Sequence, residues 1–346
     1  MSSIWNNRIS ISIFGEADSP VMGVTIEGLP VGEFIDPEEI RLFMDRRLPA
    51  TCGYKSRKTP LPRIMSGVLN GHISGGPLCA FIQNVNMRPQ EEKKPDLMMQ
   101  QRVGHGDYTG ALRYRGFRNV KELGKFTDRF TAPLCFAGAV CAQILQRRSI
   151  FVGAHIAQIH NIKDNPFDPV RIDRDGILGI RSKDFPVIND RKGWLMLEDI
   201  EKARSAGESL GGIIECAAVN IPAGVGSPVF DGLENNIAQL IFGIPGVKGL
   251  EFGAGFDAAK MIGSQNTDDF FIDSHGHVVT KTNHHGGILG GISSGMPVTL
   301  KAAFNPVRAE HDSEQDTCIV PKAVPCVEAA VNIAVLSNML DYPNFC

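Results

Sequence analysis

Apolar and polar residues alternate near the start of the chain, which is the pattern of a half-buried β-strand. Residues 10–15 form such a run, and it ends on a tight turn that contains Glu16 and Asp18. A second alternating run opens residues 23–44, turns at residues 30–32, and continues into a helical pattern with acidic residues in its first turn. The pattern therefore predicts two strands, a turn and an amphipathic helix.

The same order of patterns recurs later in the chain. Residues 215–244 alternate, turn at residues 222–224 and then adopt a helical pattern. Further along in each half, a glycine-rich turn precedes a strand-like run, at residues 71–84 and at residues 290–304. Because the pieces recur in the same order with similar separation, we predict two related α+β halves that form one pseudo-symmetric unit.

The predicted domain organisation follows from this repeat. We expect a single domain over residues 1–346, with internal halves at approximately 8–150 and 208–340. Residues 131–145 are small and apolar throughout, which predicts a helix buried on most sides. Residues 160–200 are charged with little pattern and are interpreted as surface excursions.

Composition describes an ordinary globular chain. Of the 346 residues, 43% are hydrophobic, which is enough for a substantial core. The formal net charge of -3 gives no global reason to expect nucleic acid or an anionic membrane surface as a partner. No run approaches the roughly 18 apolar residues of a membrane span, and no signal-peptide pattern follows Met1, so we expect a cytoplasmic protein. The eight cysteines form no C-x-x-C pair and are predicted to be mostly buried free thiols.

Candidate chemistry is concentrated in residues 102–130, which are polar, dotted with glycine and strongly basic. A long loop of that composition is more often functional than a plain connection. A G-x-G-x-x-A pattern over residues 253–258 suggests a dinucleotide-dependent oxidoreductase, but it lies outside repeated βαβ units, so packing glycines explain it better. Four histidines suggest zinc, but a hairpin pattern accounts for them, and we expect no metal: His275, His277, His284 and His285.

Several stretches follow one another along nearly the whole chain in the order of known motifs. "FGEADSPVMGV" is similar to F-G-E-S-H-G-P-A-L-G-V, "DRRLPA" to D-R-R-x-P-G, and "RVGHGDYT" to R-P-G-H-A-D-Y-T. "TNHHGGILGGISSG" is similar to T-N-N-x-G-G-I-L-G-G-I-S-x-G, and "DTCIVPKAVPCVEA" to D-P-C-V-V-P-R-A-V-P-V-x-E-A. These motifs belong to chorismate synthases, and the chain is identified from them as a member of that family.

The resemblance implies a fold and an activity. The fold is an α+β protein of the chorismate synthase type, a β-α-β sandwich, and the assembly is a homotetramer. The activity is the 1,4-elimination of phosphate from 5-enolpyruvylshikimate-3-phosphate to give chorismate, a step of the shikimate pathway to aromatic amino acids that requires reduced FMN. Because this phosphorylated small-molecule substrate also carries two carboxylates, its pocket must be locally cationic, and arginine forks suit such oxyanions.

The resemblance also assigns roles to individual residues. His105 matches the histidine that protonates the reduced flavin, a role that suits an imidazole. Asp316 matches the aspartate that acts as a base through flavin N5, and Asp18 occupies the place of the family's first catalytic histidine. The expected substrate-binding residues are Arg47, Arg57, Arg102 and Arg129. The expected flavin-binding residues are Lys125, Phe126, Thr127, Gln265, Asn266, Gly295, Asn305 and Arg308.

Several of these positions depart from the family's pattern. Besides Asp18, the family's R-S-S segment is Lys125-Phe126-Thr127 here, and its R-H-D-P-C begins with Glu314. An acid that faces a phosphate at close range is repulsive by several kcal/mol. Two hypotheses remain open. In the first, the chain is a divergent chorismate synthase in which substituted residues rebuild the site. In the second, it is a catalytically impaired or repurposed paralogue with a binding or regulatory role.

Overall fold

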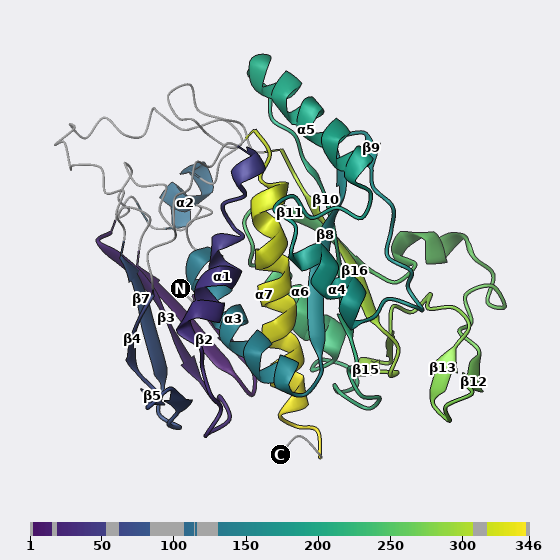
Figure 1. Cartoon of the computed structure of the whole chain (residues 1–346), viewed down its shortest axis with the longest axis horizontal. Helices are drawn as coiled ribbons and strands as arrows, with labels where there is room; N and C mark the ends of the chain where they lie inside the picture. Colours follow the sequence, from purple (N-terminus) through teal and green to yellow (C-terminus); the bar gives the residue numbers. More distant parts are fainter. Residues whose placement is uncertain are drawn as a thin grey trace.

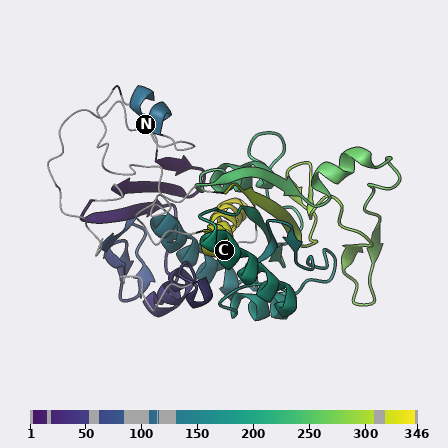
Figure 2. The same ribbon diagram turned by 90° about the horizontal axis from the view of Figure 1, so that it is seen from above.

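Two β-sheets enclose a central layer of helices in this computed structural model (Figure 1), which describes residues 3–15, 19–52, 62–83, 107–113, 115, 131–306 and 317–343. The long helices α3 (Thr131–Arg147) and α7 (Val320–Met339) pack against each other in that layer. Seen from above, one sheet lies on each side of α7 (Figure 2). Helix α3 contacts the first sheet and α7 the second, so the chain forms a β-α-β sandwich, which confirms the predicted fold class.

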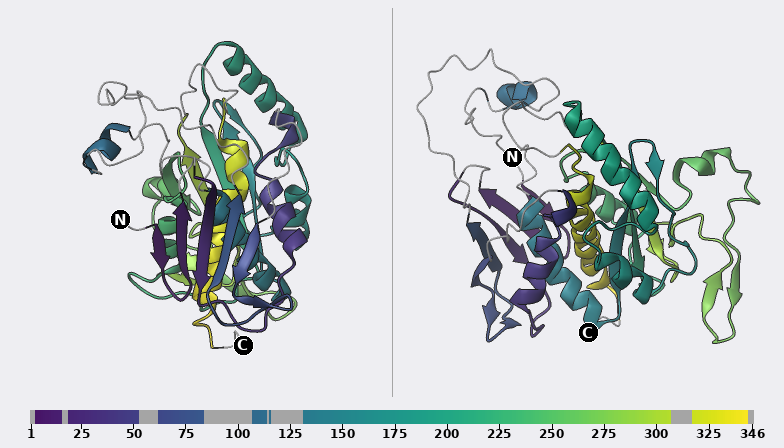
Figure 3. Two further views of the ribbon diagram at one scale, coloured as in Figure 1. Left: turned by 90° about the vertical axis from the view of Figure 1, so that its left-hand side faces the viewer. Right: turned by 45° about the horizontal axis from the view of Figure 1, so that its top comes forward.

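The first sheet has the strand order β1-β2-β3-β7-β4, and every pairing in it is antiparallel. Its strands lie side by side in the left view of Figure 3. The elements of this half are β1 (Ile4–Asn6), β2 (Ser10–Gly15), β3 (Val21–Glu27), α1 (Pro37–Asp45), η1 (Ala50–Cys52), β4 (Arg63–Ser66), β5 (Val68–Leu69), β6 (His72–Ile73), β7 (Leu78–Gln83), α2 (Asp107–Arg113) and α3.

The second sheet has the order β9-β8-β10-β16-β11, again with antiparallel pairings. The elements of this half are β8 (Phe151–Ile159), β9 (Ile162–Lys163), α4 (Arg174–Arg181), α5 (Asp190–Ser205), β10 (Gly212–Val219), α6 (Leu233–Ile241), β11 (Val247–Phe252), η3 (Gly255–Lys260), β12 (Phe270–Ile272), β13 (Val278–Thr280), β14 (Ile288–Leu289), β15 (Ile292–Ser293), β16 (Val298–Phe304) and α7.

The two sheets share one topology. In strand order, β2, β3, β7 and β4 of the first sheet correspond to β8, β10, β16 and β11 of the second. Each half also places a short hairpin before its third strand, β5–β6 in one and β14–β15 in the other. The hairpins share a backbone contact, because Ser74 N donates to Gly67 O and Ser294 N donates to Gly287 O, both at 2.9 Å. The pseudo-symmetry therefore extends to individual backbone hydrogen bonds. The boundaries of the two halves, at approximately 8–150 and 208–340, stay a prediction.

The core helices are buried as their composition predicts. Residues 131–145 of α3 and nearly all of α7 are buried. The two helices cross closely at Gly138, where an added Cβ would lie 2.2 Å from the Cβ of Ala329. By length and composition α7 is apolar enough to cross a membrane, contrary to the expectation from sequence, but 94% of its apolar window is buried inside the fold. Its composition is thus that of the core helix of a sandwich.

The segment 160–200 lies mostly at the surface, as predicted, and it also contains α4 and most of α5, which the sequence pattern did not indicate. A buried histidine anchors the segment to the second sheet. His155 of β8 lies between two carboxylates, with Nδ1 3.2 Å from Asp164 and Nε2 2.8 Å from Glu215. Burial lowers the pKa of His155, but the interactions with the carboxylates of Asp164 and Glu215 outweigh burial and raise it overall. Asp164 also accepts from the backbone N–H of Asn189, the residue that caps α5.

Candidate active site

The N-terminal ends of α3 and α7 form the candidate site, and Arg47 lies beside them. Arg47 follows α1, and its guanidinium donates a hydrogen bond of 2.7 Å to the hydroxyl of Thr131, the buried first residue of α3. The same guanidinium lowers the pKa of Cys326 on α7, so Arg47 also interacts with that helix. A predicted substrate arginine is therefore held where both core helices begin. Helix N-termini carry partial positive charge that attracts anions.

The neighbouring Arg46 is fixed by a carboxylate that sequence reasoning missed. Glu328 of α7 is fully buried and receives two hydrogen bonds from the Arg46 guanidinium, at 2.5 and 2.7 Å. Its Oε1 also accepts from the backbone N–H of Ala154 at 3.0 Å, and its Oε2 lies 3.8 Å from Nε of Arg181. The two guanidiniums lie 5.6 and 5.8 Å from the ring of Phe43. The sequence signal that could have identified Glu328 was a charged residue within an apolar helix.

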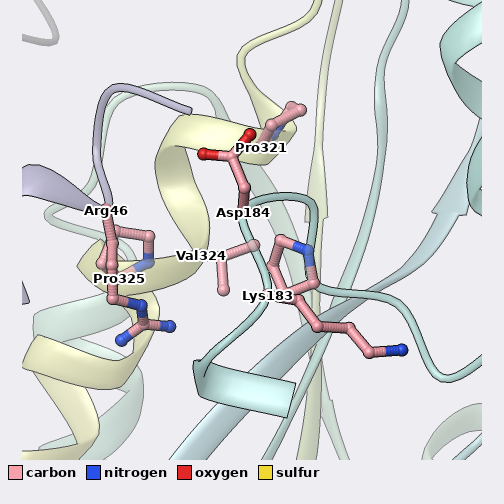
Figure 4. A pocket seen from close by; sticks show the side chains of 7 residues that line it. Arg46, Lys183, Asp184, Pro321, Val324 and Pro325 are labelled. Atoms are coloured by element: carbon pink, nitrogen blue, oxygen red, sulfur yellow. The ribbon is translucent and has the colours of Figure 1, made fainter. Parts of the chain in front are cut away.

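A second carboxylate holds the turn that follows Arg47. Asp184 lies between α4 and α5 and accepts from the backbone N–H groups of Ala50 and Thr51, at 2.9 and 2.7 Å. Figure 4 shows Asp184 beside Arg46 and Lys183 around a small cavity. The cavity encloses about 30 Å³, which admits a water molecule but is far below the size of a ligand pocket. Its walls therefore support the arginine segment rather than bind a substrate.

Asn305 lies at the same end of the core helices. Its backbone N–H donates to the carbonyl of Gly246 at 2.9 Å. A Cβ at Gly246 would lie 3.6 Å from Oδ1 of Asn305 and 3.9 Å from Cγ2 of Ile319, the residue before α7. The Oδ1 atom of Asn305 is buried and has no hydrogen-bond partner among the described residues. An unsatisfied buried acceptor is costly, and binding a ligand donor removes that cost.

Gln265 and Asn266 lie elsewhere in the molecule. They follow η3 and precede the β12–β13 hairpin, in an extension of residues 253–282 that we call the lobe. The lobe lies at the right of Figure 1, on the far side of the second sheet from β2 and β3. Asn266 Oδ1 is also buried without a hydrogen-bond partner in the described part of the chain. Within one copy of the chain these residues are not brought to Arg47.

Gly295 occupies a turn with a counterpart in the other half. It has a φ of 89° after the β14–β15 hairpin, where an added Cβ would lie 3.5 Å from the Cβ of Ala223. In the first half, Gly75 has a φ of 88°, and its added Cβ would lie 3.0 Å from Cγ2 of Val31. Both turns need a left-handed backbone, which glycine supplies without strain. The described contacts of Gly295 are thus those of a scaffold turn.

Most other predicted site residues lie outside the described ranges. The catalytic set of Asp18, His105 and Asp316 is among them, as are the substrate arginines Arg57, Arg102 and Arg129. The remaining flavin residues also lie outside: Lys125, Phe126, Thr127 and Arg308. Two of the undescribed segments, 116–130 and 307–316, directly precede Thr131 of α3 and Thr317 before α7.

The two competing patterns have structural explanations. Gly253 follows β11 at a crossing so tight that an added Cβ would lie 2.1 Å from the carbonyl oxygen of His284, and residues 255–260 form a 3-10 helix. His275 and His277 lie around an exposed hairpin turn in which their backbone N–H groups donate to Asp273. Among the residues that the structure describes, no group of three His, Cys, Asp or Glu is placed to hold a metal ion.

Comparison with known proteins extends this picture over the whole chain. The family model described as chorismate synthase matches residues 9–340. A chorismate synthase of Lancefieldella parvula is 36% identical, over 99% of this chain and 98% of its own. One of Thermococcus kodakarensis is 34% identical, over 96% of each chain. A crystal structure of a chorismate synthase superposes with a TM-score of 0.80 at 25% identity, covering 97% of this chain and 93% of the other.

Proposed function

Because the chain belongs to the chorismate synthase family, lyases that act on phosphates in the shikimate pathway, we propose that it converts 5-enolpyruvylshikimate-3-phosphate to chorismate by 1,4-elimination. The observation that carries the proposal is the position of Arg47 on the first residue of α3, beside α7. A cationic guanidinium at two helix N-termini suits a substrate with a phosphate and two carboxylates. In this proposal Arg47 binds one anionic group of the substrate.

We propose reduced FMN as the cofactor, in keeping with the family's use of reduced flavin. The buried Oδ1 atoms of Asn266 and Asn305 support this, because each is an acceptor without a described partner and a flavin ring carries an N–H donor. When bound, reduced FMN supplies the electron-rich ring that the elimination requires without net redox change. Asn305 and the undescribed Lys125 would hold it, and Asn266 would reach it from a neighbouring copy.

The proton-handling roles stay with the residues that the resemblance assigns. His105 holds a proton near the flavin, since an imidazole titrates near neutral pH. Asp316 accepts the ring hydrogen as a base. Asp18 stands where the family has a histidine, and an aspartate is ionised at neutral pH, so it does not donate a proton to the leaving phosphate. This substitution supports the second candidate function, a paralogue that binds ligands without turnover.

An anaerobic assay separates the two functions. With reduced FMN and substrate, the enzyme hypothesis expects chorismate, and His105→Ala should slow its formation by about 10² or more. Arg47→Met should raise the KM for the substrate, whereas Arg204→Met on the exposed face of α5 should leave it unchanged. Absence of turnover by the wild type, together with failure to rescue a chorismate-auxotrophic strain, would reject the enzyme. Weak FMN binding in a fluorescence titration, with no strengthening by substrate, would favour the paralogue.

We propose that the chain acts as a homotetramer in the cytoplasm. The lobe supports the assembly, because it exposes large apolar side chains: Phe256 at 79%, Ile262 at 64% and Ile272 at 71%. Exposed apolar patches of this kind mark protein interfaces. An interface there would bring Gln265 and Asn266 to a neighbouring copy. Light scattering should give the mass of four chains for the wild type and a smaller assembly for Ile272→Ser; a monomeric wild type would overturn the proposal.

A further inference from the structure

Two thiols meet between the core helices. Sγ of Cys135 on α3 lies 3.7 Å from Sγ of Cys326 on α7, and both residues are buried. The cysteines are 191 positions apart and belong to different halves of the sandwich. A disulfide bond needs its sulfur atoms about 2.0 Å apart, so an approach of under about 2 Å, shared between two side-chain rotations, would join them.

The helix crossing holds the two side chains in place. Cys135 lies three residues before Gly138, and Cys326 three residues before Ala329, so each is one turn from the point where the helices touch. Because Gly138 has no side chain, the two backbones approach closely there. The close packing of α3 against α7 therefore brings the two thiols together. Both lie within two turns of a helix N-terminus.

The charges around the pair give the two sulfurs different roles. The hydrogen bond with Cys135 lowers the pKa of Cys326 to about 7 despite burial, with further contributions from Arg47 and Thr131. Burial, together with the hydrogen bond to Cys326, raises the pKa of Cys135 well above its usual value. Of the two sulfurs, Cys326 is therefore the one that ionises more readily, and Cys135 lies beside it as the second thiol. A low-pKa thiolate beside a second thiol is the arrangement of an oxidisable pair.

Two other buried cysteines, Cys141 and Cys216, have a different environment. Burial raises the pKa of Cys141, one helical turn beyond Gly138 on α3. Burial likewise raises the pKa of Cys216 on β10. Buried thiols of this kind are chemically inert. Cys141 is therefore a matched control for Cys135, since it lies on the same helix and is equally buried.

We propose that Cys135 and Cys326 form an oxidation site at which a hydroperoxide joins the two halves of the sandwich by a disulfide bond. The Cys326 thiolate attacks one peroxide oxygen, the O–O bond breaks, and the sulfur becomes a sulfenic acid as hydroxide leaves. The Cys135 sulfur then attacks the sulfenic sulfur, forming the S–S bond and releasing water after proton transfer from the Cys135 thiol. In sum, two thiols lose two electrons and two protons, and hydrogen peroxide is reduced to two waters.

The oxidation has a consequence for the active site, and this part rests on the proposed function. The disulfide removes the thiolate that interacts with Arg47. Because an ionised Cys326 competes with the anionic substrate for this guanidinium, its loss should lower the KM for the substrate by up to about tenfold, with kcat nearly unchanged. Reduction of the disulfide by a dithiol should restore the original KM.

Peptide mapping tests the proposal. The reduced full-length chain is treated with hydrogen peroxide overnight, then denatured and alkylated, and its peptides are identified by mass spectrometry. The expected product is a Cys135–Cys326 crosslinked peptide and a chain lighter by two hydrogen atoms. Cys326→Ser and Cys135→Ser should each abolish the crosslink, and Cys141→Ser should keep it.

Full alkylation of both thiols after treatment would overturn the proposal, and so would oxidation of Cys326 beyond sulfenic acid without a crosslink. The peptide map of the wild-type chain is enough to decide whether the crosslink forms, so the test does not depend on whether the serine variants fold. The outcome is also separable from the proposed function. A chain without turnover still reports the crosslink, whereas an active chain without the crosslink rejects only the oxidation site.

Discussion

The buried carboxylate of Glu328 allows a prediction with a worked magnitude. In the Glu328→Gln variant the side chain keeps its size, but Arg46 loses one of its two hydrogen bonds, and the amide NH₂ faces a guanidinium. Arg46 and Arg181 then remain beside α7 without the counter-charge that Glu328 provides. Removing one partner of a buried ion pair costs about 3–5 kcal/mol, because an uncompensated charge stays buried. That is a large share of the roughly 5–15 kcal/mol by which a domain is stable.

Urea denaturation followed by circular dichroism measures this loss. Glu328→Gln should lower the free energy of unfolding by about 3–5 kcal/mol. The exposed pair of Arg8 and Asp341 supplies the control, and Asp341→Asn should leave the free energy of unfolding nearly unchanged. Combining Arg46→Met with Glu328→Gln should recover part of the loss, because one of the stranded charges is then gone. A Glu328→Gln variant within about 1 kcal/mol of the wild type would refute the reasoning.

Two further predictions concern titration and packing. The pKa of His155 is higher in the folded chain than the value of about 6.5 that it has in the unfolded chain. The stability that this difference provides is fully present below the unfolded-state pKa and is lost as the pH rises through the folded-state pKa. The free energy of unfolding of the wild type should therefore fall above pH 6.5, by up to about 1.4 kcal/mol per pH unit. The His155→Gln variant should lack this slope in urea titrations, and parallel slopes would contradict the assignment. At the helix crossing, Gly138→Ala should destabilise by about 1–3 kcal/mol, because its Cβ would overlap Ala329. Gly179→Ala in α4, where no atom lies within 4 Å of the added Cβ, should instead stabilise by up to about 1 kcal/mol in thermal melts, and equal melting temperatures would argue against the packing account.

Local periodicity explains which parts of the fold could be predicted. The patterns at 23–44 and 215–244 contain a strand, a turn and a helix within one short window, and the structure has β3 with α1 and β10 with α6 there. The buried α3 was predicted because its composition is apolar on every face. Such signals need no knowledge of distant residues.

The helices α4 and α5 were missed because their apolar positions are sparse. Most of their charged residues face solvent, and α4 buries only Ile177 and Ile180 in a small cluster on the second sheet. The capping residues were the sequence signals that could have predicted these two helices. Asp173 accepts from the N–H of Gly176, and Asn189 accepts from the N–H groups at the start of α5. Side chains of this type before a weak helical pattern mark a helix start.

The supporting contacts of the site could not be predicted from sequence. Glu328 is conspicuous as an acid in an apolar helix, but its partner Arg46 is 282 positions away. The contact between Arg47 and Thr131 likewise spans 84 positions. Nothing in a local pattern pairs such residues, because the pairing is made by the packing of α1, α3 and α7. The family motifs predicted Arg47 as a substrate-binding residue, and the fold shows which residues hold it.

The crossing of α3 and α7 also bears on the symmetry of the architecture. The two helices occupy equivalent places in halves of the same topology, and Gly138 meets Ala329 as Cys135 meets Cys326. Equivalent positions that contact each other across an axis define an isologous interface, the kind found in twofold-symmetric dimers. The interior of this chain is therefore arranged like the interface between two subunits of a twofold-symmetric dimer.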